Sequence, residues 1–409
     1  MKRVLLLGMG PTALSALESL AGQFHVVGIV REVRQGAAAD DAVARRAHEL
    51  SVPMLSDAGL DAVQRAITES EPDCTVVSSY NRILSAEILT HGKFVNVHYA
   101  ALPKYRGRAN VNWAILNGEP ETAITIHAIA PGLDAGNILF QQRIGIGPDD
   151  TAADIYSALN EIQRKVLGDT VTRYLDGFPG VPQDESESTY GCTRVPADGE
   201  IDWSEPTDRI YALIRALSPP YPGAHSYLEM NHVTILRASP IQDARRYAGR
   251  IPGRVVGRSR AEGSVDILTG DGILRIHELI IGENGEMIPA STAITSTKQT
   301  LGLRSSDLLT RIEELERRLT MLTDQETSRH RHEQSPPKQQ ARCPVAAVMG
   351  RTLPTPSLSA RTSRRKPPVP AEIPSSRGRA EGSRSVWSAA RSRAGAAWRP
   401  RRRAPDGLP

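Results

Sequence analysis

The sequence predicts an α/β fold in which a doubly wound, mostly parallel sheet precedes a small β-barrel of OB-like type. Two patterns predict it. In the first part of the chain short apolar runs alternate with helical segments, as in doubly wound sheets. After residue 190, short strands follow one another at close spacing with glycine turns between several of them, as in small barrels. We therefore expect domains at 1–178 and 190–302, a helical segment at 303–328 and a disordered basic tail at 329–409.

The first domain begins with an apolar run at 3–7 that fits a central parallel strand buried on both faces. Gly8-Met9-Gly10-Pro11 turns this strand into a helix. The other elements follow from the same alternation of apolar and helical patterns. Strands are expected at 25–30, 74–79, 94–98, 123–129 and 137–146, and helices at 12–20, 37–50, 60–69, 111–118 and 151–175.

The second domain follows a linker at 177–188, which we infer from its composition. Its predicted elements are short and include a single helix. The strands are expected at 225–230, 232–238, 253–258, 264–270 and 273–281, and the helix at 208–217.

A heptad pattern marks the segment after the barrel. Five apolar residues step by four, three, four and three along a predicted helix, the spacing of a coiled-coil seam. They are Leu308, Ile312, Leu315, Leu319 and Leu322. Two interpretations stay open: a homodimer through this seam, or a helix that packs on the barrel.

The charge is divided unevenly along the chain. Residues 335–409 carry 16 Lys and Arg against 3 Asp and Glu, so their net charge is +13 and that of residues 1–334 is −9. Phosphate neutralisation needs clustered basic residues, so the acidic part disfavours a large polyanion such as tRNA as the main ligand. The tail is rich in Pro, Arg and Ser and cannot bury enough surface to fold. We expect the tail to be a solvated segment. Two alternatives stay open: the tail binds nucleic acid, or it is a shifted reading frame.

Cysteine usage and hydropathy bear on the compartment. The three cysteines, Cys74, Cys192 and Cys343, are widely spaced, which argues against disulfides and a structural zinc. No stretch approaches the ~18–20 apolar residues of a membrane span. We expect a cytoplasmic protein without metal or membrane attachment.

The glycine turn GMGPTA has a second interpretation. It satisfies GxGxxA, and Glu32 follows the second strand where a ribose-binding acid would lie, so a nicotinamide-dependent reductase is an alternative. Against it, no hydride-transfer constellation appears later in the chain. We favour a tight strand-to-helix turn that needs glycine for its backbone angles.

Three polar residues define the candidate site. Asn96 and His98 lie on the same face of the strand at 94–98, because side chains alternate along a strand. That strand ends where doubly wound sheets bind their ligands. A basic loop follows, and Asp134 lies further on in the loop PGLDAG. Together, Asn, His and Asp can make an acid/base site with an oxyanion donor. His127 is expected to be an ordinary core or sheet-face histidine.

With these residues in hand, the sequence resembles the folate-dependent formyltransferases over about residues 1–300. The resemblance depends on these motifs: NRILSAEIL, FVNVH, LPKYRG, NWAILNGE, LDAG, IDWSEP, IRALSPPYPGA, PGRVV and ILTGDGILRI. It implies a Rossmann-like formyltransferase domain and 10-formyltetrahydrofolate as the formyl donor. It also implies that Asn96, His98 and Asp134 are the catalytic residues. The folate-binding residues that it implies are Arg82, Ile83, Leu84, Ala130, Pro131 and Gly132.

The acceptor is expected to be the amine of a small metabolite, such as a nucleotide-linked amino sugar or an amino-acid-derived amine. We expect it to bind beside Tyr105, Arg106, Gly107 and Arg108. The loop at 31–41 lacks the basic stretch of methionyl-tRNA formyltransferases, and the family's usual Pro-Ser-Leu-Leu-Pro is replaced at 99–103 by Tyr-Ala-Ala-Leu-Pro. The alternatives are a methionyl-tRNA formyltransferase acting on initiator tRNA, the nicotinamide-dependent reductase and a non-catalytic folate- or nucleotide-binding protein.

Overall fold

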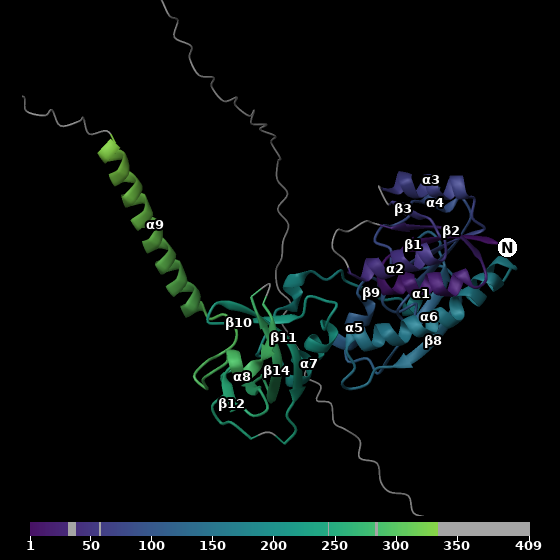
Figure 1. Ribbon diagram of the computed structural model, residues 1–409. Helices are drawn as coiled ribbons and strands as arrows, with labels where there is room; N and C mark the ends of the chain where they lie inside the picture. The colour runs from purple at the N-terminus through teal and green to yellow at the C-terminus, as the bar shows by residue number, and fades with distance from the viewer. Residues whose placement is uncertain (32–37, 57–58, 244, 283–284, 334–409) are drawn as a thin grey trace, which may run out of the picture. The chain divides into compact units, whose positions relative to one another are not determined.

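The first part of the chain is built on a mixed sheet (Figure 1). The computed structural model describes residues 1–31, 38–56, 59–243, 245–282 and 285–333. Within them, seven strands pair in the order β3-β2-β1-β4-β5-β7-β8. The first five are parallel and the last two antiparallel, so the predicted mostly parallel, doubly wound sheet is confirmed. The strands are β1 (Arg3–Gly8), β2 (His25–Arg31), β3 (Met54–Ser56), β4 (Cys74–Ser78), β5 (Lys93–His98), β7 (Glu121–Ala128) and β8 (Ile138–Gly145).

Both faces of this sheet are buried, as the uninterrupted apolar run of β1 requires. Val4 and Leu6 belong to one apolar cluster, and Leu5 and Leu7 to the other, all fully buried. Helices α1 (Gly10–Ala21), α2 (Ala38–Glu49), α5 (Asn110–Leu116) and α6 (Ala152–Leu175) contribute to the first cluster, and α3 (Leu60–Ser70) and α4 (Ala86–Leu89) to the second. Alternate side chains of one strand therefore enter two separate cores.

The helix α6 starts at a capping box. Thr151 accepts a hydrogen bond from the backbone N–H of Asp154, whose carboxylate accepts from the backbone N–H of Thr151 at 2.9 Å. These two bonds satisfy backbone donors that a helix start leaves unpaired. The helix packs beside α1, as Figure 1 shows.

The GMGPTA turn is a tight strand-to-helix connection. Helix α1 begins at Gly10, whose φ of +68° lies in the left-handed region that favours glycine. Gln163 of α6 is fully buried and donates to the carbonyl of Thr12 and to the hydroxyl of Ser78, both at 3.0 Å. The glycine at this position thus has a structural explanation. Glu32, the acid required by the nicotinamide hypothesis, lies outside the described residues.

The second part of the chain is an antiparallel sheet with the order β10-β11-β14-β13-β12, and β15 pairs with β14. Bridges Leu228↔Leu301 and Arg254↔Thr300 connect the ends of its two outer strands to one short segment, which is compatible with the predicted barrel. Helix α7 (Thr207–Ala216) packs its buried face into the core of this sheet. The strands are β10 (Ala224–Leu228), β11 (Asn231–Pro240), β12 (Val255–Ser259), β13 (Ser264–Leu268), β14 (Ile273–Ile281) and β15 (Met287–Pro289).

Residues 1–335 form one compact unit, so the division into domains at 1–178 and 190–302 stays a proposal. It is supported by a separate apolar cluster that runs from Ile201 to Leu301. After a short helix α8 (Ala290–Ala293), the long helix α9 (Ser305–Glu333) ends the described chain. It continues past residue 328, where we expected it to stop, because no Pro or Gly interrupts the sequence before Pro336. The predicted tail lies outside the described residues from 334 onward. Across the described segments, no helix is both long and apolar enough to cross a bilayer.

Candidate active site

The three predicted catalytic residues lie together. Asn96 and His98 project from the end of β5, and Asp134 projects from the loop between β7 and β8. Asn96 Nδ2 donates to Asp134 Oδ1 at 3.2 Å, and His98 Nδ1 lies 3.4 Å from Asp134 Oδ2. His98 is 5 % exposed and the Asp134 side chain 12 %, so the carboxylate is almost shielded from water. An amide, an imidazole and a carboxylate are thus within contact distance of one another.

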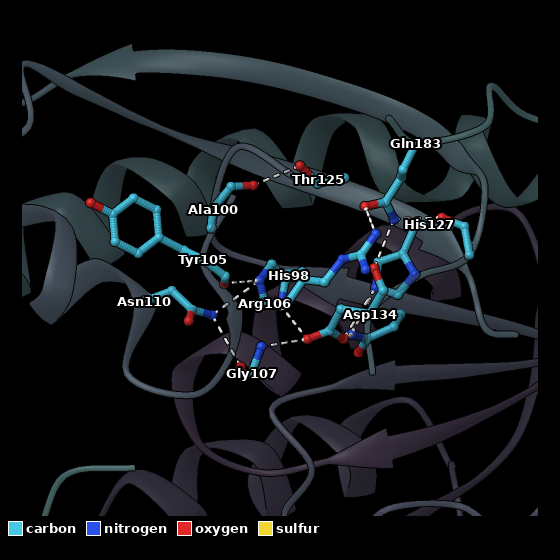
Figure 2. A network of polar contacts seen from close by, with 12 residues as sticks. His98, Ala100, Tyr105, Arg106, Gly107, Asn110, Thr125, His127, Asp134 and Gln183 are labelled. Atoms are coloured by element: carbon cyan, nitrogen blue, oxygen red, sulfur yellow. Dashed lines mark hydrogen bonds and ion pairs between the residues drawn. The ribbon is translucent and has the colours of Figure 1, made fainter. Parts of the chain in front are cut away.

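The Asp134 loop is fixed from two sides (Figure 2). The backbone N–H of Gly107 donates to Asp134 Oδ2 at 2.9 Å. Gln183 Nε2 donates to the backbone carbonyls of Asp134 and Gly136, both at 2.7 Å. Asp134 has a φ of +49°, a strained value for a residue with a side chain. These hydrogen bonds hold the residue in that conformation, with its carboxylate aimed at His98.

His98 is oriented by a backbone carbonyl. Its Nε2 lies 2.8 Å from the Tyr105 carbonyl oxygen, which accepts, and 3.1 Å from Asn110 Nδ2, which donates, so the two contacts favour opposite tautomers of the ring. The other ring nitrogen, Nδ1, faces the Asp134 carboxylate. The pair can therefore take up one further proton between Nδ1 and the carboxylate.

His127 also belongs to the site, which the sequence analysis missed. Its Nε2 lies 3.1 Å from Asn96 Nδ2 and 3.5 Å from Asp134 Oδ1, and the residue is 2 % exposed. Its Nδ1 donates to the Ala128 carbonyl at 2.9 Å, so Nε2 accepts from Asn96. The antiparallel pairing of β5 with β7 places Asn96 directly opposite His127. The contact of His127 with Asn96 could have been predicted only from the register between β5 and β7, which a single sequence does not reveal.

Burial and charge set the protonation of the site. Burial lowers the pKa of His98 below its ordinary value, although Asp134 alone would raise it. Burial would raise the pKa of Asp134, but His127, His98 and the Gly107 N–H together hold it at about 2. The charge of Asp134 is therefore the smaller of these two effects on the His98 pKa. At neutral pH the site holds a neutral imidazole beside an ionised carboxylate.

Two residues of the basic loop have contacts other than those expected. Arg106 is 1 % exposed, and its guanidinium donates to both carboxylate oxygens of Glu185 and to Gln183 Oε1. The Tyr105 hydroxyl donates to Glu119 at 2.5 Å. Neither residue lines the cavity described next. The polar groups of both are already bonded within the fold. The expected binding of the acceptor beside Tyr105 and Arg106 therefore does not fit these contacts.

A cavity of about 1220 Å³ opens above the site. All the residues that the resemblance implies for folate binding line it, as do the three predicted catalytic residues and His127. From the basic loop, Gly107 and Arg108 line it too, and Arg108 Nη2 donates to Asn81 Oδ1 at 2.7 Å. The folate-side residues are Arg82, Ile83, Leu84, Ala130, Pro131 and Gly132.

A further part of the cavity wall comes from residues that the sequence analysis did not place at the site. Arg194 lies over the Trp113 ring at 5.0 Å, and burial lowers the pKa of its guanidinium. Tyr156 and Tyr221 share a hydrogen bond of 2.9 Å between their hydroxyls. Tyr99, the unusual residue after His98, contributes to this wall, but its hydroxyl lies 2.6 Å from Gln163 Oε1 in the core. The space beside Asn96 and His98 is therefore bounded by aromatic rings and a cation.

A glycine in the Asp134 loop gives a stability prediction. In Gly136→Ala the new Cβ would lie 1.7 Å from the Ala128 carbonyl oxygen, so the loop must shift. We expect a loss of at least about 1–3 kcal/mol in the free energy of unfolding, and lower activity because Asp134 moves. Urea unfolding monitored by circular dichroism measures the loss. Gly145→Ala, whose Cβ meets no atom within 4 Å, is the matched control. Equal stability of the two variants would contradict the loop geometry.

The lowered pKa of His98 predicts the pH dependence. The folded protein resists protonation at this site while the unfolded chain does not, so acidification below the ordinary histidine pKa of about 6.5 lowers stability. The neutral imidazole of the folded protein is lost only at a lower pH, near its own lowered pKa. We expect kcat/KM to stay level from that pH upward through neutrality and to fall only on the acid side. The pH–rate profile and NMR titration of the His98 ring measure it. An acid limb centred above pH 7 would contradict a neutral His98.

Comparison with known proteins agrees with this geometry. Residues 30–171 match the family Formyl transferase, and residues 195–297 match the Formyl transferase C-terminal domain. The two matches together cover more than half of the chain, which therefore belongs to the formyltransferase family.

Solved structures share the fold at low sequence identity. An N-formyltransferase from Helicobacter canadensis in complex with folinic acid and dTDP-3-aminofucose is 19% identical, with a TM-score of 0.53 over 68% of this chain and 98% of its own. The sugar 3N-formyltransferase WlaRD, in the presence of dTDP and 5-N-formyl-THF, is 18% identical, with a TM-score of 0.50 over 70% and 99%. HypX from Aquifex aeolicus in complex with tetrahydrofolic acid is 19% identical, with a TM-score of 0.52 over 72% of this chain. This chain spans about half the length of HypX (47%).

Proposed function

We propose that this protein transfers the formyl group of 10-formyltetrahydrofolate to the amino group of a small metabolite, and that the acceptor is a nucleotide-linked amino sugar or an amino-acid-derived amine. The observation that carries the proposal is the convergence of Asn96, His98 and Asp134 on one wall of a large cavity. At about 1220 Å³, this cavity exceeds the 300–1,000 Å³ that is typical of a single ligand. Two substrates can therefore meet at the three residues.

The folate side of the cavity fits a flat, partly apolar ring system. Val77, Leu84, Leu89 and Ile129 supply apolar walls, and all pack in the second apolar cluster of the sheet. The backbone at 82–84 and 130–132 supplies polar groups that can bond the edge of a pterin. We propose that these segments hold the formyl donor with its formyl group next to Asn96.

In the proposed mechanism, the neutral amine attacks the formyl carbon, a C–N bond forms, and the carbonyl oxygen becomes negative. Asn96 Nδ2 donates an N–H to that oxygen in place of its bond to Asp134 Oδ1, and His127 keeps the amide oriented for it. The proton lost by the amine is taken up between His98 and Asp134 and is then delivered to the leaving nitrogen of the folate as its bond to the formyl carbon breaks. No covalent enzyme intermediate is required.

The acceptor side supports an anionic small molecule. Arg108 and Arg194 line the cavity from different segments and can meet phosphate or carboxylate groups. Tyr221 also lines the cavity and offers a flat face for a base or sugar ring. The ligands in the solved relatives, dTDP-3-aminofucose and dTDP, have this chemistry. The net charge of −9 over residues 1–334 disfavours tRNA as the acceptor.

The test is an assay of tetrahydrofolate release from 10-formyltetrahydrofolate with a panel of amines: dTDP- and UDP-linked amino sugars, amino-acid-derived amines and charged initiator tRNA. We expect turnover with a small amine. Turnover with the tRNA alone, lost steeply as salt rises, would replace the proposed acceptor with tRNA. Folate binding without transfer to any amine would overturn the proposed reaction and indicate a non-catalytic folate-binding protein. Nicotinamide binding without folate binding would overturn the proposed reaction.

A further inference from the structure

Helix α9 has an apolar stripe that nothing in the described chain covers. Its apolar side chains are between 40% and 67% exposed. A helix in a protein gains most of its stability from packing an apolar face, and contiguous exposed patches usually mark an interaction surface. The stripe consists of Leu308, Leu309, Ile312, Leu315, Leu319 and Leu322. The alternative in which α9 packs on the barrel does not fit these exposures.

The spacing of the stripe fits a two-stranded coiled coil. Ile312 and Leu319 occupy a positions of a heptad, and Leu308, Leu315 and Leu322 occupy d positions. Leucine at every d position, with a β-branched residue at an a position, favours two parallel strands. The periodicity therefore indicates a second α9 as the covering surface.

The charges beside the seam select the orientation. Arg311 is at position g and Glu316 is at the following e position. In a parallel pair, g of one helix faces the following e of the other, so two Arg311–Glu316 pairs form by symmetry. In an antiparallel pair, g faces g, and the charged g residues of 305–326 are Arg311 and Arg318, which repel. Arg311 now bonds Glu314 at 2.8 Å within the helix, an exposed contact that is readily exchanged.

We propose that the protein dimerises through α9, which pairs in parallel with α9 of a second copy. The proposal is independent of the reaction, since α9 contributes no residue to the cavity.

Sedimentation equilibrium of the full chain tests the dimer. We expect about twice the monomer mass of 44.4 kDa at micromolar concentration. Ile312→Lys and Leu315→Lys should each give a monomer with unchanged formyl transfer. Met321→Lys is the matched control, because Met321 is 63% exposed but at position c, outside the seam. A monomeric wild-type chain at all concentrations, or a dimer unaffected by both seam variants, would overturn the proposal.

Charge reversal tests the orientation. In a parallel pair, Arg311→Glu places a second carboxylate against the partner's Glu316, and we expect the dissociation constant to rise about 5- to 30-fold. Adding Glu316→Arg should restore it. Arg317→Glu makes the same charge change at the outer position f and should have little effect. An antiparallel pair would respond in the opposite way, because the introduced carboxylate would then attract the partner's Arg318. Tighter binding by Arg311→Glu would therefore overturn the parallel arrangement.

Discussion

Asp134→Asn is expected to lower kcat for formyl transfer by about 10²–10⁴-fold, the usual contribution of a positioned acid/base group. The amide keeps an oxygen for the Gly107 N–H but cannot take up the proton that the amine loses. It also removes the negative charge that raises the pKa of His98. Steady-state kinetics with saturating acceptor measure the loss, and KM for the folate should change little, since the carboxylate acts on the reacting proton.

The control for Asp134→Asn is Asp176→Asn, which removes a surface carboxylate paired with Lys2. Exposed ion pairs contribute little, so its activity should match the wild type. Asp134→Asn should also lose the stability that the Asp134 carboxylate contributes above its ordinary pKa of about 4. A carboxylate whose pKa is held at about 2 stabilises the folded state until the pH falls through that range. Wild-type activity in Asp134→Asn would remove this residue from the mechanism.

Asn96→Ala is expected to lower kcat by about 10²–10³-fold, as the loss of one oxyanion donor does. The hydrogen bond from the amide to the formyl oxygen strengthens as negative charge develops on that oxygen, so the effect should lie in kcat more than in KM. The substitution also leaves His127 Nε2 buried without its donor, which costs about 1–3 kcal/mol of stability. Kinetics and urea unfolding measure the two effects separately.

Two comparisons sharpen the Asn96 prediction. Asn231→Ala removes an exposed carboxamide and should leave activity unchanged. If His127 acts by orienting Asn96, then His127→Ala combined with Asn96→Ala should be no slower than Asn96→Ala alone. Additive losses in the double variant would mean that His127 has a role of its own, and full activity in Asn96→Ala would exclude the amide as oxyanion donor.

The sequence predicted the sheet because β1 and β4 are largely apolar, as strands buried on both faces are. It also placed Asn96 and His98 on one face, because alternation along a strand depends on neighbours in the sequence alone. Their shared contact with Asp134 agrees with that placement. Local periodicity was sufficient for these features.

Contacts between distant segments could not be predicted in this way. The contact of His127 with Asn96 depends on the register between β5 and β7. Arg106 is buried because Glu185 and Gln183 return to it from the linker, and nothing near Arg106 in the sequence announces either partner. A basic residue in a glycine-containing loop therefore looked like a ligand contact, although its charge is neutralised within the fold.

The segment at 183–191 changes where a minimal enzyme could end. Besides the contacts of Gln183, it supplies β9 (Tyr190–Gly191), which pairs in parallel with β6 (Arg106–Gly107) beside the Gly107 N–H that holds Asp134. A fragment cut at residue 178 would retain every proposed catalytic side chain and still lose the support of the Asp134 loop. We therefore expect that removing this segment, or cutting it with a protease, would inactivate the enzyme although every proposed catalytic side chain is retained.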